Sequence, residues 1–210
     1  MGKMAEHVNR ICIRILQLVY LNVLWIVFTI AGLILFGFGP ATFAMLTVIR
    51  QWIRGNTDIP VFSTFWNNYK TNFKETSLIG ITYLIVGIIL YTDLLYVQSI
   101  LLRILLIMVS ICYLVSFCYI FPIVAHYDWN SMLLKIKSSL LFGISYLQYT
   151  LCLFVLLAIV LVVILLNPGL FIFFGGSVGG YIIMWMTHQV FTRIEGHTAI
   201  KDSEINKSSI

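Results

Sequence analysis

Residues 36–55 read FGFGPATFAMLTVIRQWIRG, and they decide how this chain crosses a membrane. The apolar segment 38–49 is too short for a comfortable crossing, because a helix rises ~1.5 Å per residue and the hydrocarbon layer is ~30 Å thick. Gly37, Gly39 and Pro40 separate it from a longer apolar run before it. Whether this segment returns the chain to its starting side determines the topology of all that follows.

The composition is that of a membrane protein. Of 210 residues, 60% are hydrophobic and 10% are charged, and the mean hydropathy is +0.99, whereas an average soluble domain is about 25% charged. Apolar runs long enough for a transmembrane helix recur along the chain. The alternating segments of ~10 residues that build a transmembrane β-barrel are absent from the sequence. We therefore predict an all-α, polytopic transmembrane helix bundle.

Six apolar segments are candidates for crossing the membrane. They are residues 15–36, 38–49, 77–97, 100–125, 140–166 and 169–191. The first is longer than the ~7–15-residue apolar region of a cleaved signal peptide, so we expect it to be retained. Asn167, Pro168 and Gly169 predict a tight turn between the last two segments. Pro40 suits the first turn of the second helix, where its missing N–H costs nothing.

The positions of the basic residues argue that segment 38–49 crosses back. If the N-terminus is cytoplasmic and no return occurs, the basic residues between 50 and 74 lie outside, against the cytoplasmic preference of Lys and Arg. With a return, every Lys and Arg except Arg103 falls on one side. We predict about six membrane-crossing helices, the second short, tilted or re-entrant, with both termini cytoplasmic. They form one domain, residues 1–196, followed by a polar tail, 197–210.

The polar interruption at residues 50–73 keeps many aromatic rings. Their spacing of i, i+3, i+4, i+7 and i+11 places the rings on one face of a helix. The rings belong to Phe62, Phe65, Trp66, Tyr69 and Phe73. Lys70 and Lys74 lie on the other face. We predict an amphipathic interfacial helix over about 59–75 at the cytoplasmic surface.

Asp58 is the expected N-cap of this helix, with Pro60 in its first turn. Two functions stay open for it. It is an interfacial helix with its lysines near anionic lipid, or it is a docking helix whose rings enter a groove of a partner or pack on this protein's own bundle. Because aromatic side chains dominate interface energetics, Phe62 and Trp66 are expected to matter most.

Glycines in the last apolar segment predict close helix packing. Two GxxxG patterns overlap there, Gly175–Gly179 and Gly176–Gly180. Glycines at this spacing let helix backbones approach one another. We expect packing within the chain, with a dimer or partner interface as the alternative.

No motif for catalysis, a cofactor or a metal occurs in the sequence. HExxH, a Walker lysine motif, Gly-x-Ser-x-Gly and paired carboxylates are all missing. We therefore predict a protein that is not an enzyme, with no cofactor and no metal site. The cysteines form no CxxC and are expected to be reduced packing residues. They are Cys12, Cys112, Cys118 and Cys152.

A few ionisable residues deserve a separate interpretation. Asp93 and Arg103 are expected near the outer ends of two spans, as a pair or as two solvated charges. His126 and Asp128 begin a predicted polar inner loop, residues 125–137, and because they are two residues apart they do not share a helix face. His188 is expected to be hydrogen-bonded near a helix end, with a ligand or proton-transfer role as the alternative.

Three elements carry a resemblance to a known family across about residues 10–195. They are the Gly-Pro-Ala turn at residues 39–41 with the Arg-containing helix end after it, the stretch DIPVFSTF at residues 58–65, and the Phe-Pro pair at residues 121–122. Together they resemble the YesL-like family, bacterial membrane proteins of unknown function. The resemblance implies a bacterial cell membrane location. Because genes of that family commonly neighbour carbohydrate ABC-transporter components and glycan-degrading enzymes, it also implies a link to sugar uptake.

The leading hypothesis is a non-enzymatic accessory or regulatory membrane protein of a carbohydrate-uptake (ABC-type) system. The expected partners are membrane lipid, ABC permease or membrane sensor subunits, and a second copy of the chain. Nucleic acid is not expected, because the basic residues are dispersed. The alternative is a self-contained transporter for a neutral small solute. Its path would use Asn22, Thr82, Tyr83, Ser110, Tyr113, Ser116 and Gln148.

Overall fold

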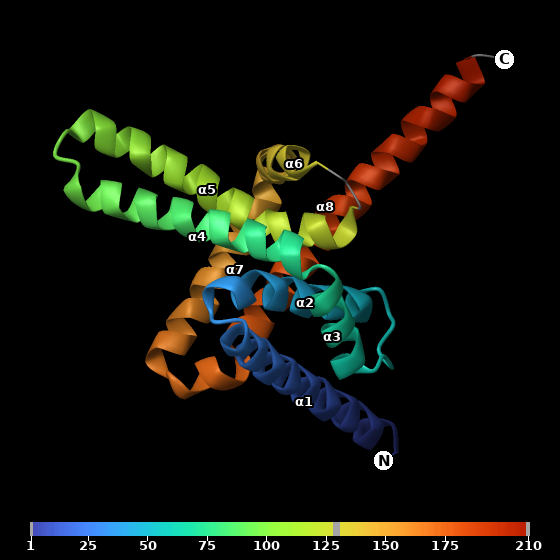
Figure 1. Ribbon diagram of the computed structural model, residues 1–210. Helices are drawn as coiled ribbons and strands as arrows, with labels where there is room; N and C mark the ends of the chain where they lie inside the picture. The colour runs from blue at the N-terminus through green and yellow to red at the C-terminus, as the bar shows by residue number, and fades with distance from the viewer. Residues whose placement is uncertain (1, 128–130, 209–210) are drawn as a thin grey trace.

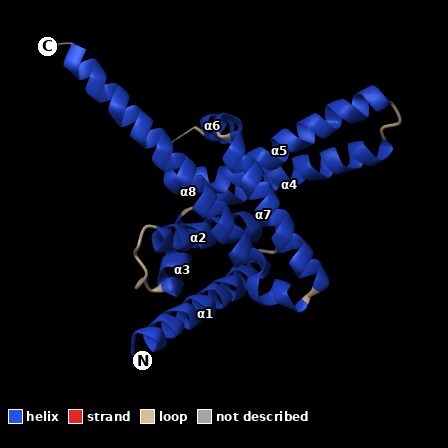
Figure 2. Cartoon of the chain, turned by 180° about the vertical axis from the view of Figure 1, so that it is seen from behind, coloured by secondary structure: helices blue, strands red, loops and turns tan. Residues whose placement is uncertain are grey.

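The computed structural model describes the backbone of residues 2–127 and 131–208, and outside short turns this part of the chain is helical (Figure 1). The helices are α1 (Gly2–Ala31), α2 (Leu35–Ile53), α3 (Val61–Thr71), α4 (Phe73–Tyr96), α5 (Ile100–His126), α6 (Met132–Ser145), α7 (Leu147–Leu166) and α8 (Gly169–Ser208). No strand occurs among these residues, as Figure 2 shows. The prediction of an all-α fold is confirmed.

Within the described residues, five helices are long and apolar enough to cross a membrane. The spans are Ile11–Ala31 in α1, α4, α5, α7, and Gly169–Arg193 in α8. The chain is therefore a multi-pass membrane protein. The short predicted segment 38–49 became α2, which is not among the five. It is instead the central helix, with most of its side chains buried between its neighbours.

α1 and α2 pack as an antiparallel hairpin. The Trp25 indole N–H donates to the Thr42 hydroxyl oxygen at 3.1 Å, and a Cβ on Gly37 would lie 2.5 Å from the Thr29 carbonyl oxygen. The two backbones therefore approach too closely for any side chain at Gly37. Tight contact between helices in lipid commonly depends on such small residues.

The break between α1 and α2 lies earlier than the sequence predicted. Leu33 and Ile34 make the turn with positive φ of 57° and 62°. Pro40 lies in the second turn of α2, which begins at Leu35. The prediction of a break at Gly37–Pro40 was wrong, because Gly37 and Gly39 serve helix contact and not the turn.

α2 and α4 cross backbone against backbone at a pair of glycines. A Cβ on Gly39 would lie 2.1 Å from the Thr76 carbonyl oxygen, and one on Gly80 would lie 3.0 Å from the Gly39 Cα. No side chain fits between the helices at this point. Gly39, predicted to mark a turn, is therefore the contact that places α4 on the central helix.

The predicted segment 140–166 is two helices, α6 and α7. They separate at Tyr146, whose φ and ψ are −117° and 52°. The Thr150 hydroxyl donates to the Gly143 carbonyl at 2.8 Å and so satisfies a group released at the break. By contrast, the turn predicted at Asn167–Gly169 is confirmed, with the Leu170 N–H donating to the Asn167 carbonyl at 2.9 Å.

α6 reverses the usual pattern of an amphipathic helix. Leu133 is 80% exposed, whereas Lys135 is 4% exposed and Ser139 is fully buried. A helix with an apolar outer face and a polar inner face suits a hydrocarbon surrounding. The sequence interpretation, which left the residues before 140 in a polar inner loop, missed this helix.

The predicted amphipathic helix over 59–75 is shorter in the structure. α3 ends at Thr71, and Asn72 is a break with φ of −102° and ψ of 14°, so Phe73 and Lys74 belong to α4. The Thr76 N–H and hydroxyl both donate to the Asn72 carbonyl at 3.0 and 2.6 Å, which anchors the new helix start.

The N-cap prediction was also wrong. Pro60, with extended backbone, takes the cap position without a side-chain cap hydrogen bond. A residue before proline is disfavoured in helical conformation, so the helix begins only after Pro60.

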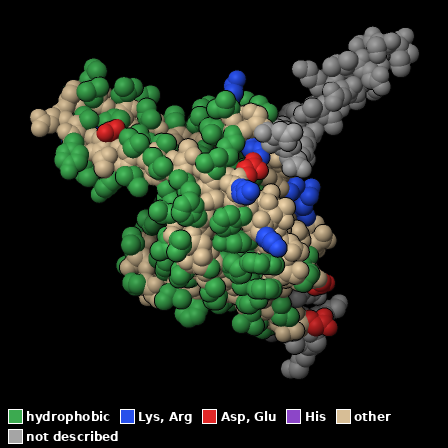
Figure 3. Space-filling model, in the orientation of Figure 1, with side chains coloured by type: hydrophobic (Ala, Val, Ile, Leu, Met, Phe, Trp, Pro, Cys, Tyr) green, Lys and Arg blue, Asp and Glu red, His purple; other side chains and the backbone are tan. Residues whose placement is uncertain are grey.

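The α4–α5 hairpin projects from the body of the molecule as an arm (Figure 1). On the face shown in Figure 3, hydrophobic side chains cover this arm, whereas the Lys and Arg side chains gather away from its tip. α8 contains most of the predicted polar tail, since its backbone is helical to Ser208.

Gly39→Ala is expected to destabilise the fold by about 1–3 kcal/mol, because the added methyl overpacks the α2–α4 crossing. Gly169→Ala is the matched control, since nothing lies within 4 Å of its Cβ position. Thermal unfolding of the detergent-solubilised protein measures both. Equal melting temperatures for the two variants would contradict the crossing.

Candidate functional site

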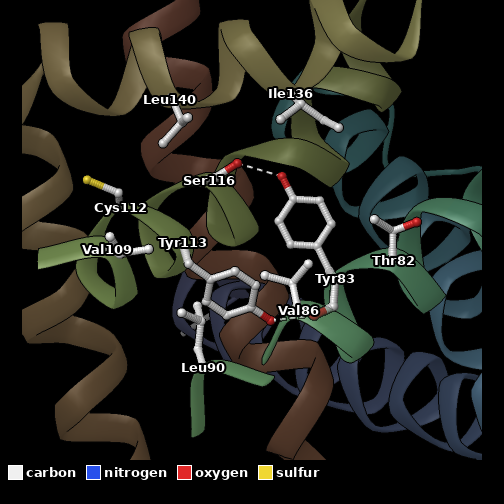
Figure 4. Close-up of a pocket in the computed structure, with 10 residues that line it drawn as sticks. All are labelled: Thr82, Tyr83, Val86, Leu90, Val109, Cys112, Tyr113, Ser116, Ile136 and Leu140. Carbon is white, nitrogen blue, oxygen red and sulfur yellow. Dashed lines mark hydrogen bonds between the residues drawn. The ribbon is translucent and has the colours of Figure 1, made fainter. Parts of the chain in front are cut away.

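A cavity of about 310 Å³ lies between α4, α5 and α6, at the base of the arm (Figure 4). Its lining residues are Thr82, Tyr83, Val86, Leu90, Val109, Cys112, Tyr113, Ser116, Ile136 and Leu140. α4 and α5 supply opposite walls because they form an antiparallel hairpin, and α6 closes one end. Its volume is at the lower end of the range typical of small-molecule sites.

The hydroxyl groups of the cavity are engaged with protein atoms. The Tyr83 hydroxyl hydrogen-bonds the Ser116 hydroxyl, as the dashed line in Figure 4 marks. Ser116 pairs with Ser139 at 2.6 Å, and Ser139 donates to the Ile136 carbonyl at 2.7 Å. Because each hydroxyl has one proton, the chain runs from Tyr83 through both serines to that carbonyl. The surface left for a ligand is apolar.

The hydroxyl group of Tyr113 is also bonded to a protein atom. Its hydroxyl donates to the Tyr83 carbonyl at 2.8 Å, and the two rings lie 5.8 Å apart between centroids. The Thr82 hydroxyl donates to the Leu78 carbonyl of its own helix at 2.8 Å. The cavity therefore suits a hydrocarbon group better than a sugar.

The structure separates the polar residues that the sequence grouped into one solute path. Thr82, Tyr83, Tyr113 and Ser116 meet at this cavity. Of the other members of the group, Ser110 donates to the Leu106 carbonyl at 2.8 Å. Asn22 lies elsewhere, between α1 and α8.

Asn22 is a fully buried side chain that joins α1 to the backbone of α8. Its Nδ2 donates to the Ile172 carbonyl at 2.6 Å, and its Oδ1 accepts from the N–H groups of Gly176 and Ser177 at 2.8 and 3.0 Å. In a regular helix the Ile172 carbonyl and the Gly176 N–H pair with each other. The Asn22 amide thus hydrogen-bonds to both groups that would pair with each other in a regular helix. Asn22 is a packing residue.

The four glycines of the predicted GxxxG patterns face different neighbours. A Cβ on Gly176 would lie 2.9 Å from the Trp25 ring, and one on Gly180 would lie 2.8 Å from the Met45 Cε. Both glycines therefore face α1 and α2. A Cβ on Gly175 would meet Phe171 of its own helix, and Gly179 has only Leu157 near it, at 3.9 Å.

A second cavity, of about 190 Å³, lies beside this stripe. It is bounded by the glycines of α8 and by rings of α1, α2 and α5. The rings are those of Trp25, Phe38, Phe117 and Phe121.

The predicted ring face of α3 packs around one residue of α1. The centroid of the Phe28 ring lies 5.2 Å from Phe65, 5.5 Å from Trp66 and 5.1 Å from Tyr69. The Tyr69 hydroxyl donates to the Phe28 carbonyl at 3.2 Å. Burial raises the pKa of this phenol, so it stays a neutral donor. Phe73 joins from α4, 5.4 Å from the Tyr69 ring.

The ring residues differ in what they leave exposed. Phe65 and Tyr69 are buried, whereas Phe62 is 51% and Trp66 is 41% exposed. Of the two lysines on the predicted opposite face, Lys70 lies exposed on α3 and Lys74 lies exposed on α4. The ring face therefore packs largely on the protein's own bundle.

Sequence reasoning missed an ion pair that ties α6 to α4. The buried Lys135 ammonium pairs with the Glu75 carboxylate. A second charged side chain joins helices as well, since the Arg50 guanidinium of α2 donates to the Ala125 carbonyl at the end of α5. A lysine beside serines in an otherwise apolar segment was the signal, and it was read as loop polarity.

The remaining ionisable candidates are not among the residues that line the two cavities. The His188 Nδ1 lies 3.4 Å from the Thr192 hydroxyl. The His126 ring packs on Phe191 at 4.6 Å. The Arg103 guanidinium donates to the Val97 carbonyl at 2.9 Å. Asp128 lies outside the described residues, among which no cluster of three metal-ligating side chains occurs.

Close sequence relatives cover nearly the whole chain. It is 37% identical over 193 residues to the Uncharacterized protein YteU of Bacillus subtilis (strain 168), an alignment that covers 90% of this chain and 86% of YteU. The chain belongs to the DUF624 family. That family model, Protein of unknown function, DUF624, matches residues 18–94.

Two further DUF624 relatives come from the same organism. YesL is 32% identical over 199 residues, covering 91% of this chain and 92% of YesL. YesV is 30% identical over 190 residues, covering 88% and 91%. Both are called uncharacterized, and no solved structure matches the chain. The resemblance to YesL-like proteins is confirmed.

In this DUF624 protein, Asn22→Ala is expected to lower stability by about 1–3 kcal/mol, because backbone groups of α8 lose their buried partner. Thr82→Ala is the control, since its hydroxyl bonds only its own helix. Melting temperatures in detergent compare the two. A fall no larger for Asn22→Ala than for Thr82→Ala would show that the Asn22 amide contributes little.

Proposed function

We propose that this chain is a non-enzymatic accessory membrane protein that binds the transmembrane helices of a partner through its α4–α5 arm. The arm is defined as residues 84–114. The observation that carries the proposal is its burial pattern. All of these residues are described, and none is buried by the chain itself.

The arm offers two apolar sides rather than one. Ile88 of α4 and Met108 of α5 are both exposed, as are Leu101 and Tyr96 near the tip. Helices in lipid associate through shape and van der Waals packing. A hairpin free on both sides can therefore lie between partner helices without unfolding its own body.

The class of partner follows from the family resemblance. Permease or sensor subunits of a carbohydrate-uptake system are the partners that it implies, and their membrane helices have the surface that an apolar arm fits. An accessory role also agrees with the engaged hydroxyls of the α4–α6 cavity. We propose a cytoplasmic location for both termini, because the exposed Lys70 and Lys74 then lie inside.

A transporter for a neutral solute is the second candidate. It is favoured by the meeting of Thr82, Tyr83, Tyr113 and Ser116 at one cavity. Uptake of a labelled sugar by proteoliposomes tests it directly. Uptake that Ser116→Ala or Tyr83→Phe alters would replace the accessory proposal, and no uptake would leave the accessory role in place.

A photo-crosslinking amino acid at Ile88 or Met108 is expected to capture one defined membrane protein in native membranes. The same probe at Ile159 or Leu161 on exposed α7 is the matched control and is expected to capture lipid alone. Affinity purification and mass spectrometry identify the products. Lipid adducts only, at all four positions, would overturn docking through the arm.

A ring variant tests whether α3 contributes to the same contact. Phe62→Ala with Trp66→Ala is expected to weaken recovery of the partner while leaving the protein inserted, because both rings are partly exposed. Phe65→Ala is the comparison, expected to cost about 3–5 kcal/mol of stability because its ring is fully buried. Unchanged partner recovery with the double variant would limit the interface to the arm.

A further inference from the structure

We propose that α1 and α2 form a re-entrant hairpin whose closed end, residues 32–37 with the turn at Leu33 and Ile34, lies among lipid acyl chains inside the membrane. Both ends of the hairpin then emerge on the same side. Under this proposal α1, although long and apolar enough to cross, does not cross. The inference is independent of the partner proposed above, because it concerns the contact of this turn with the bilayer.

The contacts of α2 show where the turn lies along the lengths of α4 and α5. Gly39 contacts α4 at Thr76, in the first turn of α4. On the other side, the Phe38 ring stacks on Phe117 of α5, with centroids 6.4 Å apart and planes 4° apart. Both contacts lie in the halves of α4 and α5 nearest the charged residues Lys74, Glu75 and Arg50 on the body. The start of α2 is therefore level with the inner part of these helices.

Helix lengths show how far the α1–α2 turn lies below the tip of the α4–α5 arm. From Gly80 to Tyr96, α4 continues for about 24 Å at the rise of an α-helix, and α5 covers a similar length from Phe117 back to Ile100. The α1–α2 turn rises only about 6 Å beyond Phe38. It thus ends roughly 18 Å below the tip of the arm, and about 14 Å below the level of the charged Asp93 on α4. Figure 1 shows the arm extending far beyond this turn.

The composition of the closed end, residues 32–37, fits hydrocarbon and not water. It reads GLILFG, and Leu33, Ile34, Leu35 and Phe36 are all exposed, with Leu33 at 77%. A turn between helices at an aqueous surface normally contains polar, glycine or proline residues. Exposed leucine, isoleucine and phenylalanine side chains match an acyl-chain environment, and the one hydroxyl beside Gly32, that of Tyr69, is engaged with the Phe28 carbonyl.

The turn also satisfies its own backbone donors. The Leu33 N–H donates to the Ile30 carbonyl at 2.9 Å, and the Ile34 N–H donates to the Thr29 carbonyl at 2.9 Å. This is the pairing of a Schellman motif. The Leu35 N–H then donates to the Leu33 carbonyl at 2.7 Å across a γ-turn. Backbone groups at membrane depth need such internal partners, because lipid offers none.

The conformation that allows this closure is costly for these residues. Leu33 and Ile34 have φ of 57° and 62°, and a bulky or β-branched side chain rarely adopts positive φ. Glycine or asparagine would fill these positions with less strain at an aqueous surface. Apolar side chains that can be solvated by lipid explain why the sequence keeps leucine and isoleucine here.

The other ends of the two helices carry the charges. Arg14 lies near the start of the apolar part of α1, beside Trp52 at the end of α2, where they line one cavity with Leu18. Arg50 reaches the end of α5. Positive charge at the open end and an apolar turn at the closed end are the distribution expected of a hairpin inserted from one side.

Cysteine accessibility tests the proposal on the full chain. In a background with Cys12, Cys112, Cys118 and Cys152 replaced by alanine, Leu35→Cys probes the turn and Ser99→Cys, between α4 and α5, is the control. Sealed vesicles of both orientations are treated with a membrane-impermeant maleimide. Leu35→Cys is expected to react at least about tenfold more slowly than Ser99→Cys from either side, because the reactive thiolate is disfavoured away from water. Both are expected to react fully in denaturing detergent.

A spin label at the same position gives the depth. At Leu35→Cys, relaxation by oxygen is expected to exceed relaxation by a water-soluble nickel chelate, with the reverse at Ser99→Cys. Rapid maleimide labelling of Leu35→Cys from the side on which Ser99→Cys reacts would overturn the proposal, since the turn would then reach the far surface.

A charge variant provides a test that needs no cysteine background. Leu35→Lys is expected to lower the amount of folded protein in the membrane, whereas Ser99→Lys is expected to leave it unchanged. Equal amounts for both would also overturn the proposal.

Discussion

The structure depends on direct contact between helix backbones around α2. Gly37 lies against α1, Gly39 lies against α4, and Gly180 of α8 faces Met45. At Gly37 and Gly39 the neighbouring atoms are backbone and no side chain fits, whereas Gly180 faces side chains of α2. Together the three positions allow three neighbours to pack on one short helix. Because lipid supplies no hydrophobic driving force between helices, this close approach is what holds the bundle together.

Polar groups inside the bundle follow from the same arrangement. A buried amide, hydroxyl or ammonium without a hydrogen-bond partner is costly, and several of these groups find their partner on a neighbouring helix. Asn22 uses the backbone of α8, the Tyr83–Ser116–Ser139 chain ends on a carbonyl, and Lys135 uses Glu75. Asn22 joins α1 to α8, and the other two sets join α6 to α4 and α5. They act as cross-links between helices, and they are poorly placed to solvate a passing molecule.

The sequence predicted the features that depend on local composition. The helical class, the turn at Asn167–Gly169 and the clustering of rings around α3 all follow from hydropathy and spacing. It failed where tertiary contact decides the outcome. A glycine that makes a turn and a glycine that makes a crossing look alike in sequence, so Gly39 was misplaced. The polar inner face of α6 was likewise read as a loop, since its partner Glu75 is distant in the chain. Four residues of the cavity were predicted together as part of a polar solute path. The cavity surface is nevertheless apolar, because the hydroxyl groups bond to one another and to backbone carbonyls.

The arm and the re-entrant hairpin are two consequences of one geometry. If α1 and α2 crossed the whole membrane beside α4 and α5, they would cover the outer halves of those helices, and residues 84–114 would contain buried positions as residues 115–123 do. Because α2 begins level with Phe117 and its turn ends shortly beyond, none of residues 84–114 in the α4–α5 arm is buried by the chain. A short central helix therefore creates the free apolar surface on which the accessory role is based. Lengthening α2 would cover that surface, so the proposed accessory role depends on the short length of α2.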